Sequence, residues 1–332
     1  MRCLVTGLGS MGKRRIRNLE SIGGITMAGL DRRADRREEA SARYGIQTFD
    51  TFDVALTEFM PDILVISTDP SLHMDYAFLA LKHGLHCFIE ASVVDASRIS
   101  ELGKALKNKG LVMVPSCTMR YYPGPIAIRE VISAGKIGKP LSLNYVTGQF
   151  LPDWHPWEDI RDFYVSKRET GGAREIVPFE LTWLNEIFGE PAPLACIKDK
   201  ISDIDADIDD IYCCLLRYPG GMLANITIEV ISRPKAIREL NILGSSGRLV
   251  FSGENNCVRY ISVGDDDWSS IDLGSGTIEK GYINPEEPYI SEMVDFLKAI
   301  NQLDDALFPN NLESDVRILS LLNNLEKLSI SI

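Results

Sequence analysis

The feature that most constrains the fold lies near the start of the chain, where a short apolar run leads into a glycine-rich loop and then a helical pattern. The loop is Gly7-Leu8-Gly9-Ser10-Met11-Gly12, which matches G-x-G-x-x-G. In such a strand–loop–helix unit, the first glycine permits a tight turn and the second lets the backbone approach a pyrophosphate. The third lets helix and strand pack closely. The alternative is a glycine-rich turn with no ligand.

An acidic residue follows at the spacing expected of a dinucleotide-binding unit. A second apolar run, residues 25–30, ends in Asp31, about 20 residues after the loop, where a carboxylate accepts hydrogen bonds from a ribose. The start of the helix adds free N–H groups and a positive dipole end for the phosphates. We therefore predict a bound dinucleotide. Asp31 favours NAD because a carboxylate repels the 2′-phosphate of NADP, whereas Arg32 and Arg33 would attract that phosphate.

Length, charge and cysteine usage limit the class of protein. The 332 residues suffice for two domains, and a net charge of −12 argues against nucleic acid or an anionic membrane as a partner. No apolar run approaches the length of a membrane span, and a strand-like run begins at once, so we expect no secretion signal. The seven cysteines are scattered and include no C-x-x-C pair, which favours reduced thiols and a cytoplasmic location.

The first 118 residues alternate between strand-like runs and helical patterns. After the glycine loop, strand-like runs occupy residues 63–66, 87–89 and 111–114. Helical patterns occupy residues 34–44, 71–83 and 95–109. This alternation is typical of a parallel sheet with helices on both faces. We therefore predict an α/β fold in which residues 1–118 form a dinucleotide-binding Rossmann domain.

The rest of the chain, residues 119–332, has a different pattern. Helical patterns near 124–134 and 174–188 flank a strand at 141–150 and a loop rich in Trp, Pro and Asp. Alternating runs joined by tight turns then predict a mainly antiparallel sheet, followed by helices near 288–302 and 312–330. The acidic run 203–210 lacks the glycine and glutamate of a calcium loop, so we predict an acidic loop and no metal.

Laid out in this way, the whole chain resembles the Gfo/Idh/MocA family (glucose–fructose oxidoreductase, inositol dehydrogenase and relatives). The landmarks that carry the resemblance are Gly7 to Gly12, Ser67-Thr68-Asp69-Pro70-Ser71-Leu72-His73, Ile89-Glu90-Ala91-Ser92, Met119-Arg120-Tyr121-Tyr122-Pro123, Gly135-Lys136-Ile137-Gly138-Lys139 and Gly171-Gly172. The resemblance implies a second α/β domain with an open, mainly antiparallel sheet that binds substrate and makes a homodimer or homotetramer. It also implies an NAD(P)-dependent oxidoreductase.

The resemblance extends to residues that would bind cofactor and substrate. It implies that the cofactor contacts Gly7, Leu8, Gly9, Ser10, Met11, Gly12, Asp31, Arg32, Ser67, Thr68, His73 and Glu90. The run Leu151 to Asp159 is similar to members found among genes for surface sugars and sialic-acid-like compounds. A small-molecule substrate, a sugar, cyclitol or nucleotide-sugar, would contact Arg120, Tyr121, Trp154, His155, Arg161 and Lys167. Arg161 and Lys167 suit an anionic group such as a phosphate, although both also suit a solvated surface.

The catalytic positions depart from the family pattern. The family usually carries Glu-Lys-Pro after the fifth strand, with the lysine in the catalytic site, but this chain has Glu90-Ala91-Ser92. The family's later motif places an aspartate and then a histidine after paired glycines. Here Ile176 stands at the aspartate position, and Phe179 or Glu180 stands at the histidine position. The usual lysine, aspartate and histidine are therefore all replaced.

If the chain is redox-active, another group must take the proton of the substrate hydroxyl. The candidates near the expected cleft are His155, Glu175, Glu180 and Tyr164. Each also has an ordinary structural interpretation: a packed histidine, a helix carboxylate in an ion pair, or a buried tyrosine. We expect an NAD(P)-dependent oxidoreductase with a non-standard acid or base.

Two further classes of function fit the same residues. In one, the dinucleotide oxidises the substrate transiently, which gives a lyase, an epimerase or a glycosidase. Such a reaction needs an acid and a base around one carbon, and Glu175 with Glu180 or His155 would supply them. In the other, the chain is a catalytically silent dinucleotide-binding subunit, because a fold does not fix a function.

Overall fold

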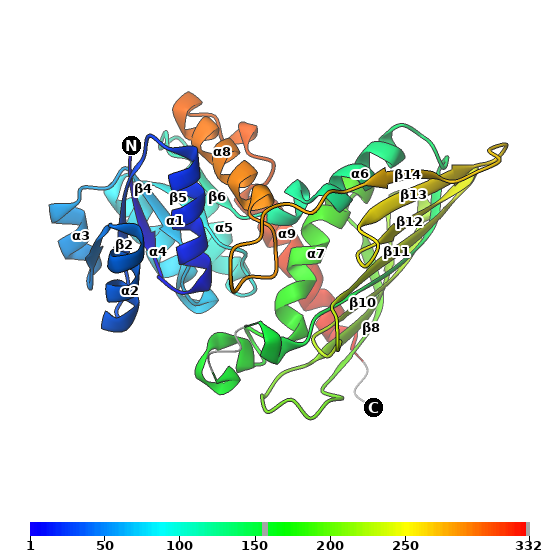
Figure 1. Ribbon diagram of the computed structural model, residues 1–332, viewed down its shortest axis with the longest axis horizontal. Helices are drawn as coiled ribbons and strands as arrows, with labels where there is room; N and C mark the ends of the chain where they lie inside the picture. Colours follow the sequence, from blue (N-terminus) through cyan, green and yellow to red (C-terminus); the bar gives the residue numbers. More distant parts are fainter. Residues whose placement is uncertain (155–158, 330–332) are drawn as a thin grey trace. The chain divides into compact units, whose positions relative to one another are not determined.

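The computed structural model describes residues 1–154 and 159–329. By its internal contacts the chain divides into two compact units. The first consists of Met1–Thr118 together with Thr277–Arg317, and the second of Met119–Gly276 together with Ile318–Ile332. We describe each unit by itself (Figure 1).

The first unit contains a six-stranded, all-parallel sheet. Its strands are β1 (Arg2–Thr6), β2 (Thr26–Leu30), β3 (Gln47–Phe49), β4 (Ile63–Ile66), β5 (His86–Ile89) and β6 (Met113–Pro115). The strand order is β3-β2-β1-β4-β5-β6, so the direction of succession reverses between β1 and β4. This is the doubly wound order of a dinucleotide-binding domain, in which ligands bind outside the carboxyl ends of the strands at the reversal point. The predicted Rossmann domain is confirmed.

Helices cover both faces of this sheet. They are α1 (Ser10–Ile22), α2 (Ala34–Tyr44), α3 (Phe52–Glu58), α4 (His73–His83), α5 (Ala96–Leu106) and α8 (Glu287–Gln302). Helix α1 packs against α8, and α4 packs against α5. Strand β4 is buried along its whole length because helices lie on both sides of it, which explains its continuous apolar run.

The second unit contains an eight-stranded sheet. Its strands are β7 (Pro140–Gly148), β8 (Ala192–Asp199), β9 (Ile211–Arg217), β10 (Leu223–Glu229), β11 (Ile237–Gly244), β12 (Gly247–Ser252), β13 (Cys257–Ser262) and β14 (Ser269–Asp272). The order is β14-β13-β12-β11-β7-β10-β9-β8, and every neighbouring pair is antiparallel except β7 with β10. The predicted mainly antiparallel sheet is confirmed.

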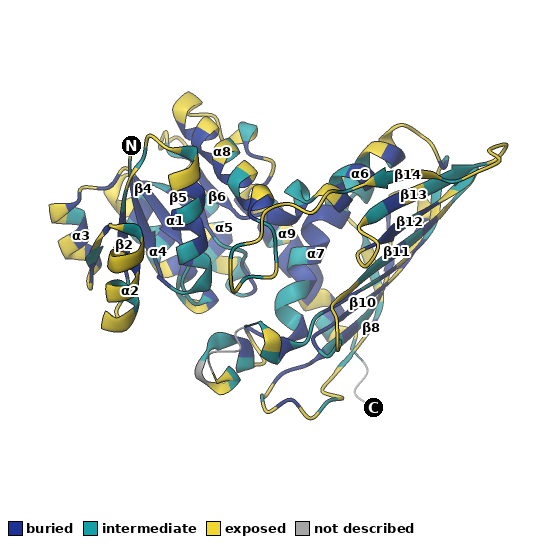
Figure 2. Ribbon diagram, in the orientation of Figure 1, coloured by how far each residue is buried: buried dark blue, intermediate teal, exposed yellow. Residues whose placement is uncertain are grey.

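Two helices pack against this sheet. Helix α6 (Pro123–Ser133) contacts β12 and β13, and helix α7 (Ala173–Phe188) contacts β9 and β10. Along β9 the burial alternates, with Tyr212, Cys214 and Leu216 buried and Leu215 exposed. Figure 2 shows both buried and exposed residues along these strands. One face therefore forms the core of the unit with the helices, and the other face looks outward.

The remaining elements in the described residues are one long helix and seven short 3₁₀ turns. Helix α9 (Leu312–Lys327) begins in the first unit and ends in the second. The turns are η1 (Pro70–Leu72), η2 (Thr118–Tyr121), η3 (Leu151–Asp153), η4 (Ile160–Asp162), η5 (Tyr164–Ser166), η6 (Pro219–Gly221) and η7 (Asp305–Leu307). Across the described residues, no helix combines the length and the apolar character needed to cross a membrane.

The predicted domain boundary after residue 118 differs in one respect from the observed division of the chain into two units. The sequence pattern assigned all of residues 119–332 to the second domain, whereas Thr277–Arg317 packs with the first unit. Helix α8 belongs to that segment and lies on α1. The chain therefore returns to the first unit after building the second sheet.

Candidate functional site

The glycine loop has the close contacts that the motif requires. Gly7 has φ +83°, and a Cβ on it would lie 2.4 Å from the carbonyl oxygen of Ser67. A Cβ on Gly12 would lie 1.8 Å from the carbonyl oxygen of Gly7. Neither position has room for a side chain, so both glycines are needed to join β1 to α1 this tightly.

The middle glycine leaves the start of α1 open to a ligand. Gly9 is the N-cap residue of α1, and no side chain caps this helix end. A Cβ on Gly9 would first meet the guanidinium of Arg36, at 3.3 Å, and no backbone. The N–H groups of Ser10 and Met11, in the first turn, thus lie where they can donate to a phosphate group. This part of the loop fits a pyrophosphate.

Asp31 closes the loop from the end of β2. Its Oδ2 accepts a hydrogen bond from the N–H of Leu8 at 2.8 Å, and its Oδ1 accepts one from the N–H of Arg33 at 2.9 Å. The side chain remains 11% exposed, and Arg36 Nη1 lies 3.9 Å from Oδ2. The carboxylate keeps lone pairs for ribose hydroxyls. The exposed Arg32 lies next to it, and its carbonyl accepts a bond from Arg37.

The polar residues after β4 form a tight turn into α4. The ring Nε2 of His73 lies 3.1 Å from the carbonyl oxygen of Thr68, and burial lowers the pKa of this histidine. His73 Nδ1 is buried and has no hydrogen-bond partner among the described residues. The side chain is only 2% exposed, so a neutral ring is the favoured state. Ser67, at the start of this turn, donates a hydrogen bond to Glu90 Oε1 at 3.3 Å.

Glu90 is bound by an arginine from the helix that follows the glycine loop. Arg15 Nε donates to Glu90 Oε1 at 2.6 Å, and Arg15 Nη2 donates to Glu90 Oε2 at 3.0 Å. The Arg15 side chain is fully buried, whereas Glu90 is 12% exposed. Two parallel bonds between planar groups fix both orientation and position. Glu90 is therefore held rigidly at the carboxyl end of β5.

The same arginine contacts a second carboxylate, which comes from α8. Arg15 Nη2 lies 2.9 Å from Glu292 Oε2, and Glu292 is also completely buried. Glu292 accepts further bonds from the Ser116 and Thr118 hydroxyls and from the N–H of Cys117. Burial raises the pKa of Glu292, and the charge of Arg15 opposes that shift. Burial alone would lower the pKa of Arg15, but the two carboxylates outweigh it and raise the pKa above its ordinary value.

Neither Arg15 nor Glu292 was predicted at this site from the sequence pattern. Arg15 lies in the basic run Lys13-Arg14-Arg15-Ile16-Arg17, which has the composition of a solvated helix face. Glu292 is far along the chain, in a segment that the sequence pattern assigned to the second domain but that packs in the first unit.

In the second unit, the structure brings together two of the predicted acid–base candidates. Glu175 lies in the first turn of α7, and the Tyr164 hydroxyl, from η5, donates to its Oε1 at 2.7 Å. Val165 and Gly171 lie so close that a Cβ on Gly171 would be 2.0 Å from the Val165 carbonyl oxygen. This contact holds the Tyr164 turn against the start of α7. His155 lies outside the described residues.

Glu180 lies one turn further along α7 and is completely buried. Its Oε2 accepts bonds from the Tyr145 hydroxyl and from the indole of Trp183, both at 2.7 Å. Its Oε1 accepts a bond from Arg238 at 2.8 Å. Because both oxygens accept hydrogen bonds from neighbouring side chains and the carboxylate is completely buried, this geometry favours a structural role for Glu180 over the predicted catalytic one.

The predicted substrate-binding residues are spread over several elements of the second unit. The Nε of Arg120 donates to the carbonyl oxygen of Thr182 at 3.1 Å, so this arginine packs along α7. Tyr121 is half-buried at the end of η2. The half-buried Trp154 has its indole Nε1 buried, with no hydrogen-bond partner in the described part of the chain. Lys167 is exposed and pairs with Asp207 through the backbone.

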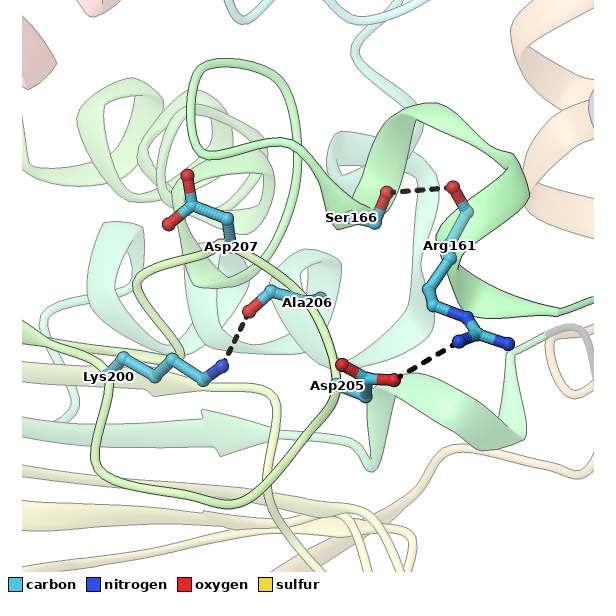
Figure 3. A pocket seen from close by; sticks show the side chains of 6 residues that line it. All are labelled: Arg161, Ser166, Lys200, Asp205, Ala206 and Asp207. Atoms are coloured by element: carbon cyan, nitrogen blue, oxygen red, sulfur yellow. Dashed lines mark hydrogen bonds and ion pairs between the residues drawn. The ribbon is translucent and has the colours of Figure 1, made fainter.

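A surface hollow is lined by residues from the loop that contains Arg161 and from the acidic loop, residues 203–210. It is lined by Arg161, Ser166, Lys200, Asp205, Ala206 and Asp207 (Figure 3). Arg161 Nε and Nη2 donate to the two carboxylate oxygens of Asp159, and its Nη1 lies 3.5 Å from Asp205 Oδ2. Lys200 donates to the carbonyl oxygen of Ala206 at 2.7 Å. Arg161 is thus paired with acids, and Asp205 and Asp207 also line the hollow, so it is not a purely basic site for a phosphate group. In residues 1–154 and 159–329, no cluster of His, Cys, Asp and Glu side chains has the make-up of a metal site.

The glycine loop, the doubly wound sheet and the carboxylate at the end of β2 define the class of protein as an NAD-binding Rossmann protein. A family model described as "Oxidoreductase family, NAD-binding Rossmann fold" matches residues 1–116. A second, described as "GFO/IDH/MocA C-terminal domain", matches residues 126–250. Together the two models cover well over half of the chain, which belongs to the GFO/IDH/MocA oxidoreductase family.

The individual relatives share a low percentage of identical residues with this chain. The chain is 23% identical over 235 residues to trans-1,2-dihydrobenzene-1,2-diol dehydrogenase of Mus musculus, a match covering 66% of this chain and 67% of that enzyme. It is 33% identical over 146 residues to inositol 2-dehydrogenase of Klebsiella pneumoniae (strain 342), covering 42% of this chain and 43% of that one. The second match thus spans less than half of the relative.

Among solved structures, levoglucosan dehydrogenase in complex with NADH and levoglucosan superposes with a TM-score of 0.84 at 17% identity. The superposition covers 99% of this chain and 97% of that chain. At this identity the likeness shows a shared fold and leaves the substrate open.

Proposed function

We propose that the protein is an NAD-dependent oxidoreductase of a sugar, cyclitol or nucleotide-sugar, in which Tyr164 and Glu175 perform the proton transfer. The observation that carries this proposal is the 2.7 Å hydrogen bond between the Tyr164 hydroxyl and Glu175 Oε1. Three further features support it: the family is one of oxidoreductases, one relative is an inositol dehydrogenase, and one structural neighbour holds levoglucosan.

The pair can replace the proton-transfer residues that the family motif places nearby. Bound NAD supplies the acceptor for a hydride from the substrate carbon. As the hydride leaves, the Tyr164 oxygen takes the proton of the substrate hydroxyl and passes its own proton to Glu175 Oε1. The Glu175 carboxylate orients the phenol and is the base that receives its proton. The substrate is left as a carbonyl compound and Glu175 is left protonated.

The oxidised dinucleotide preferred by this site is NAD. Asp31 accepts two backbone N–H bonds and stays partly exposed, so it is placed to bind ribose hydroxyls and to repel a 2′-phosphate. Arg32 and Arg36 lie beside it and reduce that repulsion, which leaves NADP as a weaker alternative.

The experiment that tests this proposal follows substrate conversion by mass spectrometry. A panel of cyclitols, sugars and nucleotide-sugars, including those of surface polysaccharides, is incubated with the protein and with NAD⁺ or NADP⁺. We expect a product lighter by two hydrogens, with matching cofactor reduction. Glu175→Gln and Tyr164→Phe should each lower kcat by about 100-fold, the contribution typical of general acid–base catalysis. Glu186→Gln, on the same helix α7, should retain activity.

The other outcomes distinguish the remaining functions. Loss of water, epimerisation or cleavage of a glycosidic bond without net cofactor change would replace the proposal with transient oxidation. Tight NAD binding with no conversion across the panel would indicate a silent subunit. Unchanged conversion in both variants would show that Tyr164 and Glu175 do not transfer the proton. His155 would then be the remaining candidate.

A further inference from the structure

The cluster of Arg15, Glu90 and Glu292 lies entirely within the first unit and joins three elements that are distant in sequence. Arg15 comes from α1, Glu90 follows β5, and Glu292 comes from α8. One guanidinium bridges the two carboxylates at 2.6 to 3.0 Å. A buried ion cluster costs desolvation and seldom adds stability over a well-packed apolar core. Its presence at the ligand-binding edge of the sheet therefore calls for a role beyond stability.

The topology places Glu90 beside the half of the dinucleotide that Asp31 does not bind. Asp31 ends β2, on one side of β1, and marks the ribose of the adenosine half. Ser67 and Glu90 follow β4 and β5, on the other side of β1. The second half, which carries the nicotinamide, extends across the carboxyl ends of those strands. Of the three charged groups, only Glu90 is exposed at that edge, by 12%.

The charge at this position has a direct consequence for the two forms of the cofactor. The nicotinamide ring of NAD⁺ carries a positive charge that NADH lacks, so a nearby carboxylate attracts the oxidised form more strongly. Because the effect depends on distance and on a low local dielectric constant, the carboxylate must be held in one place. The paired bonds from Arg15 do this for Glu90, and the Glu292 carboxylate holds the Arg15 guanidinium in turn.

We propose that Arg15 and Glu292 are positioning residues that hold the Glu90 carboxylate beside the nicotinamide, where it favours NAD⁺ over NADH. Arg15 Nε and Nη2 both point at Glu90, and Nη2 also lies on Glu292 Oε2. Ser116, Cys117 and Thr118 fix Glu292 from the end of β6. Helix α8 therefore contributes to cofactor selection although it belongs to the C-terminal part of the chain.

The test measures equilibrium binding of NAD⁺ and NADH by calorimetry on the full chain, without any substrate. The readout is the ratio of the two dissociation constants, Kd(NADH)/Kd(NAD⁺). Glu90→Gln keeps the shape and removes the charge, and we expect the ratio to fall about tenfold, as for a charge pair several ångströms apart in a partly buried site. An unchanged ratio in Glu90→Gln would overturn the proposal.

Arg15→Lys tests positioning separately from charge. Lysine keeps the positive charge and loses the forked pair of bonds, so Glu90 is held less firmly and the ratio should fall about threefold, less than in Glu90→Gln. In the Glu90→Gln background the same change, and likewise Glu292→Gln, should have little further effect on binding. Additive losses in that background would show that Arg15 and Glu292 act on the fold alone and would overturn their part of the proposal.

A matched control exists on the same pair of helices. Glu286 lies just before α8 and binds Arg14, Arg17 and Asn18 on α1, with no bond to Glu90. Glu286→Gln should lower the melting temperature and leave both dissociation constants unchanged. A shift of the ratio in this variant equal to that in Glu90→Gln would attribute the effect to helix packing and refute the role of Glu90. Since no turnover is measured, the outcome is independent of the function proposed above.

Discussion

At the scale of single residues, the glycine loop is where the sequence most directly dictates the structure. Backbone atoms leave no room for a side chain at Gly7 or Gly12. The carbonyl oxygen of Ser67 lies against Gly7, and the carbonyl oxygen of Gly7 lies against Gly12. Backbone atoms cannot move aside as a flexible side chain can, so the cost of a Cβ must appear as strain in β1 or α1. The motif is therefore a requirement of the fold before any ligand binds.

Gly12→Ala is the direct test of this requirement. We expect a loss of more than about 3 kcal/mol in the free energy of unfolding, because the new Cβ would lie 1.8 Å from an oxygen atom. The measurement is urea denaturation followed by circular dichroism. Gly103→Ala in α5 is the control: its Cβ would meet Leu312 at an ordinary 3.8 Å, and alanine favours a helix interior by up to about 1 kcal/mol. Equal effects in the two variants would contradict the steric argument.

Single residues also show the limit of prediction from sequence. The position of Asp31 beside the glycine loop could be predicted because it depends on a spacing within one strand–loop–helix–strand unit. Arg15 and Glu292 could not, since their pairing depends on how α8 packs on α1. A sequence pattern can indicate partners that are close in the sequence. A buried ion pair between residues that are distant in the sequence produces no such pattern.

At the scale of elements, helix α7 separates two carboxylates that sequence alone could not distinguish. Glu175 at the start of the helix binds a tyrosine from a turn, whereas Glu180, one turn later, lies in the core against β7 and β11. Burial raises the pKa of Tyr145 well above its ordinary value, so this tyrosine remains a donor to Glu180. Residues five apart in a helix of about 3.6 residues per turn point to different sides, so the helical period separates the two side chains but does not show which of them the sheet covers.

Removing the Glu180 carboxylate should therefore destabilise the second unit. Glu180→Ala leaves Arg238, Tyr145 and Trp183 without their shared acceptor, and we expect a loss of about 3–5 kcal/mol in the free energy of unfolding. Glu186→Ala, on the same helix, removes a partly exposed ion pair with Arg129 and should cost less than about 1 kcal/mol. Both are measured by chemical denaturation. A small effect in Glu180→Ala, together with lost turnover, would restore the catalytic role predicted from the sequence.

The elements that sequence patterns missed share a physical cause. Strand β3 has only three residues, and α3 has seven, too few for a period to show. Strand β8 carries polar and apolar residues whose burial is irregular around a register shift between Pro193 and Ala195. The parallel pairing of β7 with β10 joins strands far apart in the chain, which turn signals cannot indicate. Long elements with regular alternation, such as β9 and β10, were predictable.

At the scale of the whole molecule, the chain is not a simple succession of two domains. The segment Thr277–Arg317 returns to the first unit, where α8 packs on α1 and supplies Glu292. A boundary drawn from sequence can mark where the pattern changes, near Thr118, but it cannot show which earlier element a late helix will cover. Expression of residues 1–118 alone would consequently remove Glu292, one of the two carboxylate partners of Arg15.

The outward face of the second sheet leads to the last prediction, which concerns assembly. Apolar side chains on this face are 36% to 47% exposed: Ile197, Leu215, Leu223, Ile237 and Leu243. They alternate with buried residues of β8 to β11, so they lie on the side away from the core. Exposed apolar side chains gathered on one face of a sheet are costly in water and favour association with an identical face. We therefore expect a homodimer or homotetramer.

The measurement is size-exclusion chromatography with light scattering at micromolar concentration. Leu215→Lys combined with Leu243→Lys places charges on this face, which should raise the dissociation constant at least about tenfold and give a monomer peak. Val54→Lys, at an exposed position of α3 in the first unit, is the matched control and should leave the assembly intact. A wild-type protein that is monomeric, or a double variant that still assembles, would show that the sheet face is not the interface. Because the substituted side chains point away from the core, the unfolding free energy of the double variant should stay within about 1 kcal/mol of the wild type, so a monomer would reflect lost contacts between copies.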